Sequence, residues 1–224
     1  TMDSEVIVNL IARSKADTQE ERIADAARQI EGAFSLVITT NAPLVGVRDP
    51  QGFRPLCLGK TEHGYVLSSE SCAFDAIKAE FIRDIDPGEM VIIDDRGVRS
   101  TIYAEPQKID KKLCVFEYIY FARSDSKIDG QSVYETRLNM GRELYNETKY
   151  DADIVMSIPD SGTTAALGYA RASGIPFAEG LIKNRYSGRT FIKPNQEERE
   201  LAVRMKLNAM PEVVGGKRIV LIDD

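Results

Sequence analysis

The chain has 224 residues, of which 43% are hydrophobic and 29% are charged, a composition that excludes collagen-like and disordered proteins. Its 29 Lys and Arg face 35 Asp and Glu, and this net charge of −6 gives no support to a protein that binds nucleic-acid phosphates. No apolar run approaches the roughly 20 residues of a membrane span, so we expect neither a nucleic acid nor a membrane as partner.

The first half of the chain predicts two helices followed by strands. Residues 3–14 form an amphipathic helix that Asp3 or Ser4 could cap, and residues 18–31 form a second helix. A further helix is expected over residues 71–84, and strands are expected at 33–39, 44–49, 54–59, 65–69, 90–94 and 97–103. Helices followed by a run of strands indicate an α+β domain, which we end at residue 105 where a polar stretch begins.

The second half alternates strands with helices. Strands are expected over 113–123, 152–158, 175–182 and 217–224, and helices over 132–147 and 163–174. This alternation, with strands that are apolar on both faces, is typical of a parallel α/β sheet. Because the chain starts on a helix and stops on a buried strand, we interpret it as an internal piece of a longer protein.

The cysteines Cys57, Cys72 and Cys114 lie far apart and form no CxxC motif. This pattern predicts neither a disulfide framework nor a zinc site. It is typical of a reducing compartment, so we expect a cytoplasmic protein. Arg48 and Arg54 lie among turn residues with Asp49, and we interpret them as an ion-paired hairpin.

A turn of small polar residues follows the strand that ends at Ile158. Ser161, Gly162 and Thr163 stand there, directly before a helix. Ligands of open parallel sheets bind at the carboxyl ends of strands, and a helix N-terminus attracts phosphate. The motif predicts a phosphate cradle; an ordinary helix cap is the alternative that this motif alone leaves open.

Two other segments of the second half suit the same kind of ligand. Asp223 and Asp224 follow four aliphatic residues, and such a pair could bind sugar hydroxyls or Mg²⁺, or simply end a strand. Residues 183–206 contain seven basic side chains against three acidic ones. We expect this segment to form a cationic lid over the cradle, with a solvated basic surface as the alternative.

These motifs together resemble one family. IVMSIPDSGTTAALGYA, GLIKNRYSGRTFI, RMKLN and KRIVLIDD stand in the order and spacing found in the phosphoribosyltransferase half of the amidophosphoribosyltransferases. In the first half, DSEV, VRDPQGFRPLCLG, LSSESCAFD, DIDPGEMVII and CVFEYIYFARSDS resemble the later part of that family's glutaminase domain. The resemblance implies an N-terminal-nucleophile-type (αββα) partial domain over 1–105, which is the C-terminal part of a class II glutamine amidotransferase domain. It implies that residues 106–224 are the N-terminal part of an α/β parallel-sheet type I phosphoribosyltransferase domain, so that the chain is truncated at both ends.

The resemblance also implies an activity. The full-length enzyme would convert phosphoribosyl pyrophosphate, glutamine and water into 5-phosphoribosylamine, glutamate and pyrophosphate, the first step of de novo purine biosynthesis. A first-residue cysteine would release ammonia from glutamine. That cysteine is not in this chain, so we expect the isolated chain to be inactive. Mg²⁺ as cofactor, purine nucleotides as feedback inhibitors and a homo-oligomer are implied in the same way.

Roles are implied residue by residue. Asp3 would hold the glutamine α-amino group, and Ile192 would signal between the two sites. Cys114 stands at a position that ligates a [4Fe–4S] cluster in some members, while others keep the cysteine without a cluster. Mg²⁺ would lie near Ser161, Asp223 and Asp224. The residues that would bind phosphoribosyl pyrophosphate are Ser161, Gly162, Thr163, Lys183, Tyr186, Arg189, Asp223 and Asp224.

Two alternatives remain at this point. A non-catalytic regulator that binds phosphoribosyl pyrophosphate on the same fold would need a nucleic-acid or partner surface, which the acidic charge balance does not favour. Another class II glutamine amidotransferase would share the first half of the chain but not the motifs KNRYSGRTFI and VLIDD.

Overall fold

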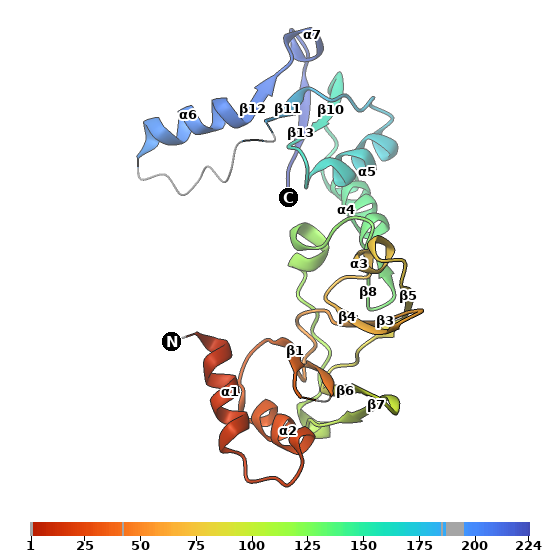
Figure 1. Ribbon diagram of the computed structural model, residues 1–224. Coiled ribbons are helices and arrows are strands. Elements are labelled where there is room, and N and C mark those ends of the chain that lie inside the picture. The colour runs from red at the N-terminus through yellow and green to blue at the C-terminus, as the bar shows by residue number, and fades with distance from the viewer. Residues whose placement is uncertain (1, 42, 185, 187–194) are drawn as a thin grey trace. The chain divides into compact units, whose positions relative to one another are not determined.

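The structure is a computed structural model that divides the chain into two compact units (Figure 1). The residues that it describes are 2–41, 43–184, 186 and 195–224. The first unit comprises residues 1–117 and 121–132, and the second comprises residues 118–120 and 133–224.

The division between the units falls near residue 132, whereas the sequence analysis drew it at residue 105. The difference has a local cause in the backbone of the connecting segment. The amide of Lys112 donates to the carbonyl of Gln51 at 2.7 Å, and the amide of Cys114 donates to the carbonyl of Phe53 at 3.1 Å. These hydrogen bonds hold the polar stretch against the first unit.

The first unit places helices before antiparallel strands, as predicted for an α+β domain. Its helical elements are α1 (Asp3–Arg13), α2 (Gln19–Gln29), α3 (Cys72–Ala76), the 3-10 turn η1 (Pro106–Lys108) and the π-helix η2 (Glu117–Phe121), whose middle residues belong to the second unit. Its strands are β1 (Ser35–Thr39), β2 (Leu44–Arg48), β3 (Cys57–Thr61), β4 (Gly64–Ser68), β5 (Glu80–Asp84), β6 (Glu89–Asp94), β7 (Gly97–Ile102), β8 (Lys127–Ile128) and β9 (Gln131–Ser132). The described residues pair in the orders β1-β2-β6-β7, β4-β3-β5 and β8-β9.

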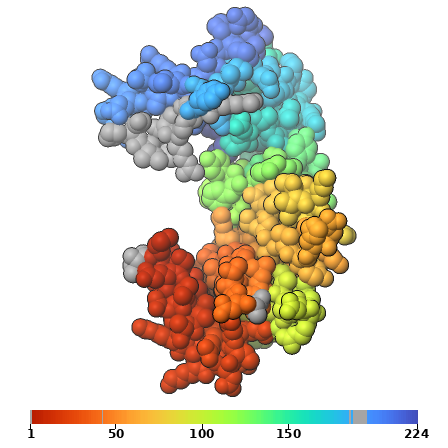
Figure 2. Space-filling view, viewed as in Figure 1, coloured from red at the N-terminus to blue at the C-terminus, as the bar shows by residue number. Residues whose placement is uncertain are grey.

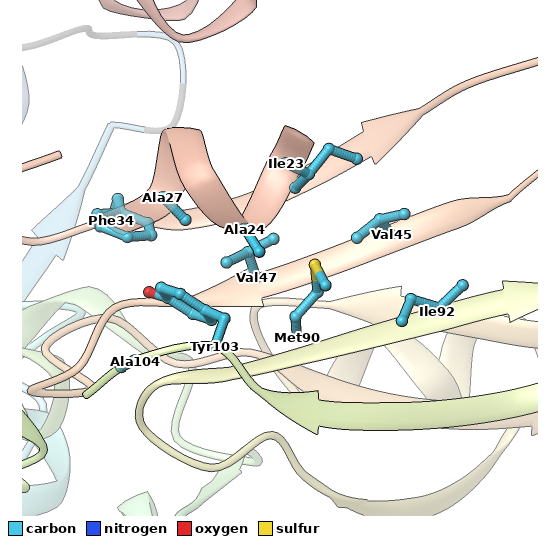
Figure 3. Close-up of a cluster of buried hydrophobic side chains, with 10 residues drawn as sticks. All are labelled: Ile23, Ala24, Ala27, Phe34, Val45, Val47, Met90, Ile92, Tyr103 and Ala104. Atoms are coloured by element: carbon cyan, nitrogen blue, oxygen red, sulfur yellow. The ribbon is translucent and has the colours of Figure 1, made fainter. Parts of the chain in front are cut away.

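Helix α2 packs on strands β2 and β6 to form the core of the first unit (Figure 3). The helix begins with a capping box, in which the Thr18 hydroxyl accepts from the Glu21 amide and the Glu21 carboxylate accepts from the Thr18 amide. The buried side chains of this cluster are Ile23, Ala24, Ala27, Phe34, Val45, Val47, Met90, Ile92, Tyr103 and Ala104. Helix α1, in contrast, buries none of its residues and lies on the surface in Figure 2.

Three local predictions that fall in the first unit or at its end are wrong. Met2 is the N-cap of α1 and gives no side-chain cap, so Asp3 and Ser4 lie inside the first turn. The helix predicted over 71–84 ends at Ala76, because the residues after it pair as β5 with β3. The strand predicted over 113–123 contains the π-helix η2 instead, since a short apolar run has no period that separates strand from helix.

The second unit contains a short parallel pair of strands covered by helices. Its elements are α4 (Val133–Glu147), β10 (Ile154–Ser157), α5 (Thr163–Ser173), β11 (Leu181–Lys183), α6 (Gln196–Lys206), β12 (Leu207–Ala209), α7 (Pro211–Val214) and β13 (Ile219–Ile222). Strand β10 runs parallel to β13, and β11 pairs antiparallel with β12. The strand predicted over 175–182 is reduced to β11 and one parallel bridge between Val155 and Phe177. Among the described residues, no helix has the length and apolar character of a membrane span.

Glycines allow α4 and α5 to approach closely. A Cβ added to Gly141 would lie 1.9 Å from the carbonyl oxygen of Ala165, and one added to Gly168 would lie 2.1 Å from that of Leu138. Both clashes are with backbone, so the helices themselves would have to move apart. We therefore expect Gly141→Ala to lower the free energy of unfolding by about 2–3 kcal/mol.

Urea unfolding of the Gly141→Ala variant and of the unchanged chain measures this loss of stability. Glu147→Ala at the exposed end of α4 is the control, and we expect it to change stability by less than about 0.5 kcal/mol. Equal stabilities of the Gly141→Ala and Glu147→Ala variants would show that α4 and α5 do not pack as closely as described.

Candidate functional site

The carboxyl ends of β10 and β13 lie at the same edge of the parallel sheet. Ser157 at the end of β10 is opposite Ile222 at the end of β13. The Ile158 amide donates to the Ile222 carbonyl at 2.9 Å and extends the pairing by one residue. The polar turn that follows β10 and the two acids that follow β13 therefore emerge side by side, where open parallel sheets bind their ligands.

The turn and the acid pair are in direct contact. The Ser161 hydroxyl donates to Oδ1 of Asp224 at 2.6 Å, although the two residues are 63 positions apart in the chain. A side chain at position 162 could not fit, because its Cβ would lie 2.7 Å from the carbonyl oxygen of Ile222 and 3.2 Å from Cα of Asp223. Glycine at this position thus allows the turn to lie against the end of β13.

Helix α5 begins at this turn. Gly162 is its N-cap and provides no side-chain cap, and the first turn contains no acidic residue. The partial positive charge of the helix N-terminus is therefore left for another anion. The Thr163 amide bonds to the carbonyl of Asp160 at 3.3 Å, and the Thr163 hydroxyl lies 3.1 Å from that of Ser157.

A cavity of about 590 Å³ opens beside the turn. It is lined by Ser157, Pro159, Asp160, Thr163, Phe177, Glu179, Gly180, Leu181, Ile182 and Lys183. Lys183, at the end of β11, reaches the turn with its ammonium group, and Nζ lies 2.6 Å from Oδ2 of Asp160. A phosphate group in this cavity would meet a lysine, hydroxyls and a helix N-terminus.

The two terminal acids repel each other. Burial raises the pKa of Asp223, and the neighbouring Asp224 carboxylate raises it further. A hydroxyl donor or a divalent cation bound between the two carboxylates would relieve this repulsion. The described residues contain no group of three or more His, Cys, Asp or Glu that could hold a metal ion by themselves.

The other residues that the sequence analysis predicted as site residues lie outside the turn and the acid pair. Asp3 is exposed in the first turn of α1, and Cys114 is half-buried in the first unit. Tyr186 is fully exposed. Arg189 and Ile192 lie outside the described residues.

Sequence reasoning missed Asp160 as a member of the site. Its position in the turn was visible in the sequence, but its ion pair with Lys183 depends on where β11 lies relative to the turn in the folded unit. The sequence did contain a signal for this pair, since Asp160 stands in the turn before α5 and Lys183 is the first residue of the basic segment.

The chain is similar to known proteins over its whole length. A family described as glutamine amidotransferase domain matches residues 1–76. The amidophosphoribosyltransferase of Synechococcus elongatus is 53% identical over 231 residues and that of Bacillus subtilis is 46% identical over 222 residues. These alignments cover 100% and 99% of this chain, and 46% of each relative. The chain is homologous to the amidophosphoribosyltransferases.

Two solved structures extend the match to the fold. The glutamine phosphoribosylpyrophosphate amidotransferase from B. subtilis complexed with ADP and GMP superposes with a TM-score of 0.91 at 46% identity, over 99% of this chain and 48% of that one. A structure described as the allosteric regulatory enzyme of purine biosynthesis gives 0.89 at 46% identity, over 98% and 47%. The predicted fold class is thereby confirmed. The chain spans about half the length of the amidophosphoribosyltransferases that it matches.

Proposed function

We propose that this chain is the part of an amidophosphoribosyltransferase that binds phosphoribosyl pyrophosphate. The enzyme would convert phosphoribosyl pyrophosphate, glutamine and water into 5-phosphoribosylamine, glutamate and pyrophosphate, the first step of purine biosynthesis. The hydrogen bond from Ser161 to Asp224 carries this proposal, because it joins a phosphate cradle to a pair of carboxylates. A ligand that carries a diphosphate and two neighbouring hydroxyls would bind to the cradle and to the carboxylates at the same time.

Each part of the site has a task in this reaction. Asp223 and Asp224 would accept hydrogen bonds from the two ribose hydroxyls and so orient C1 of the sugar. Ser161, with the backbone amides of Gly162 and Thr163, would donate to the diphosphate oxygens. Ammonia attacks C1 while the bond to the diphosphate breaks, and these donors would stabilise the negative charge that develops on the leaving pyrophosphate.

Magnesium fits the donors present. Asp223, Asp224 and Ser161 supply oxygen ligands, the type that Mg²⁺ prefers, and Mg²⁺ is often held by one or two carboxylates together with substrate phosphates. When bound, Mg²⁺ would neutralise charge on the leaving diphosphate.

The first half would contribute the glutaminase chemistry. The match of residues 1–76 to a glutamine amidotransferase domain supports the assignment of residues 1–105 to the C-terminal part of that domain, with 106–224 as the N-terminal part of the phosphoribosyltransferase domain. Asp3 would hold the α-amino group of glutamine. Lys183, Tyr186 and Arg189 would close over the substrate, and Ile192 would couple the two sites.

The remaining proposals concern cofactors, inhibitors and location. Cys114 supplies one thiolate where a [4Fe–4S] cluster takes four, so a cluster would need three further ligands. The B. subtilis relative was solved with ADP and GMP, which supports purine nucleotides as feedback inhibitors. Three free cysteines favour a reducing, cytoplasmic setting, and we expect a homo-oligomer as in the family resemblance.

A chimera tests the proposed function. This chain would replace the matched half of the B. subtilis relative, and formation of phosphoribosylamine would be measured with glutamine and phosphoribosyl pyrophosphate. We expect turnover that requires Mg²⁺ and stops with EDTA. A folded chimera that hydrolyses glutamine but never consumes phosphoribosyl pyrophosphate would refute the proposal, and one that binds this substrate without turnover would favour the regulator.

A further inference from the structure

The ion pair between Asp160 and Lys183 lies in the wall of the cavity described above. The backbone of Lys183 is held by the antiparallel pair β11–β12, in which Lys183 is opposite Leu207, and the Asn184 amide donates to the Lys206 carbonyl at 2.7 Å. From this anchor the side chain reaches the turn after β10, where Nζ lies 2.6 Å from Oδ2 of Asp160. The lysine side chain is 32% exposed and the aspartate side chain 82% exposed, so the pair faces solvent.

The charges around the cavity do not favour an anion by themselves. Among the residues that the structure describes, the charged ones in its lining are Asp160, Glu179 and Lys183, which are two acids and one base. The one lysine among them is already neutralised by Asp160. A diphosphate that enters must therefore either take Lys183 from Asp160 or bind next to two carboxylates, which repel it.

We propose that Asp160 competes with the diphosphate for Lys183 and thereby sets the affinity of the site for anions. Asp160 is a positioning residue, because it acts through the lysine. It holds the ammonium group at the turn, 2.6 Å away, and gives it up to a phosphate oxygen of the ligand. This inference rests on the proposed phosphoribosyl pyrophosphate site and adds to it an internal counter-ion that the ligand must displace.

Binding of inorganic pyrophosphate to the chimera that contains this chain, measured by calorimetry in the presence of Mg²⁺, tests the competition. The Asp160→Asn chimera should bind pyrophosphate about threefold more tightly than the unchanged chimera, which is the scale of a solvent-exposed ion pair. Asp160→Ser should shift affinity in the same direction. Lys183→Met should weaken pyrophosphate binding. In the double variant, Asp160→Asn should add little affinity to that of Lys183→Met, because the lysine for which Asp160 competes is absent.

Glu179→Gln is the matched control for simple charge removal. It takes one negative charge from the same cavity wall, and among the described residues its carboxylate forms no ion pair. Its gain in pyrophosphate affinity should be smaller than that of Asp160→Asn. A gain of affinity also separates this role from structural damage, which would only weaken binding.

The outcomes separate this inference from the proposed function. If Lys183→Met weakens binding while Asp160→Asn leaves it unchanged or weakens it, the competition is overturned and the proposed site survives. The competition is also overturned if the gain of Asp160→Asn persists in full without Lys183. Failure of the unchanged chimera to bind pyrophosphate in the presence of Mg²⁺ would overturn both.

Discussion

Replacing Arg48 by methionine should lower the free energy of unfolding by about 3–5 kcal/mol, the largest stability effect that we expect in this chain. The guanidinium is fully buried and bonds to the carbonyls of Ile85, Gly52 and Arg54. Its two terminal nitrogens also donate to both carboxylate oxygens of Asp129, at 2.9 and 3.1 Å. Methionine would fill much of the volume but would satisfy none of these acceptors.

Most of this loss of stability comes from the Asp129 carboxylate, which would stay buried without its arginine partner. Burial raises the pKa of Asp129, but the hydrogen bonds and charge of Arg48 outweigh it and hold the pKa below its usual range. Without Arg48 the side chain of Asp129, which is 7% exposed, would keep one cationic partner among the described residues, the more distant Lys111 at 3.4 Å. An unpaired buried charge is costly.

Urea unfolding, with Arg96→Met as control, measures the effect. Arg96 is also an ion-paired arginine of the first unit, but its side chain is 80% exposed, so its loss should cost less than about 1 kcal/mol. Adding Asp129→Asn to Arg48→Met should recover part of the stability, because it removes the stranded charge. The account of Arg48 as a central buried cation fails if the two arginine variants unfold at the same urea concentration.

Changing both terminal acids to asparagine should reduce synthesis of phosphoribosylamine by the chimera about 100-fold or more, because two charge-assisted hydrogen bonds to the ribose would be lost. Asp223→Asn with Asp224→Asn keeps the size of both side chains. The hydrogen bond from Ser161 to Asp224 can persist through the amide oxygen, so the turn should keep its place. Hydrolysis of glutamine should continue, since it belongs to the other half of the proposed enzyme.

Asp151→Asn is the control for this experiment. Asp151 is 86% exposed, pairs with Arg218 and precedes β10, so it lies at the opposite end of the parallel pair from the site. We expect its turnover to stay within about twofold of the unchanged chimera. Equal loss of synthesis and glutamine hydrolysis after the change at Asp223 and Asp224 would count against their role on the ribose.

Local pattern was enough for several elements. The apolar strand β10, the small-residue turn and helix α5 with its closing Gly174 were predicted because each uses interactions within a few residues. The same holds for helix α2, although its capping box between Thr18 and Glu21 was not predicted. Pattern was insufficient over 71–84, where pairing with β3 converts the end of a predicted helix into a strand.

Long-range partners were beyond the reach of the sequence. Arg48 was interpreted as part of an ion-paired hairpin with Asp49, but its carboxylate partner is Asp129, 81 residues later. Arg54 pairs with Glu117, whose side chain is 4% exposed. Nothing in the local pattern marks such partners, because several acids are equally available until the strands and loops have taken their positions.

The amino-acid sequence by itself determined several single elements, among them α2, α4, β10 and α5, together with the small-residue turn and the acid pair, since each of these is set by a short run of residues. Only the tertiary structure decided that Ser161 touches Asp224 and that Lys183 is held by Asp160. Those contacts join segments 63 and 23 residues apart. They exist because parallel pairing brings two strand ends to one edge and because β11, which pairs with β12, places Lys183 within reach of the turn after β10; both depend on how the elements pack rather than on local preference.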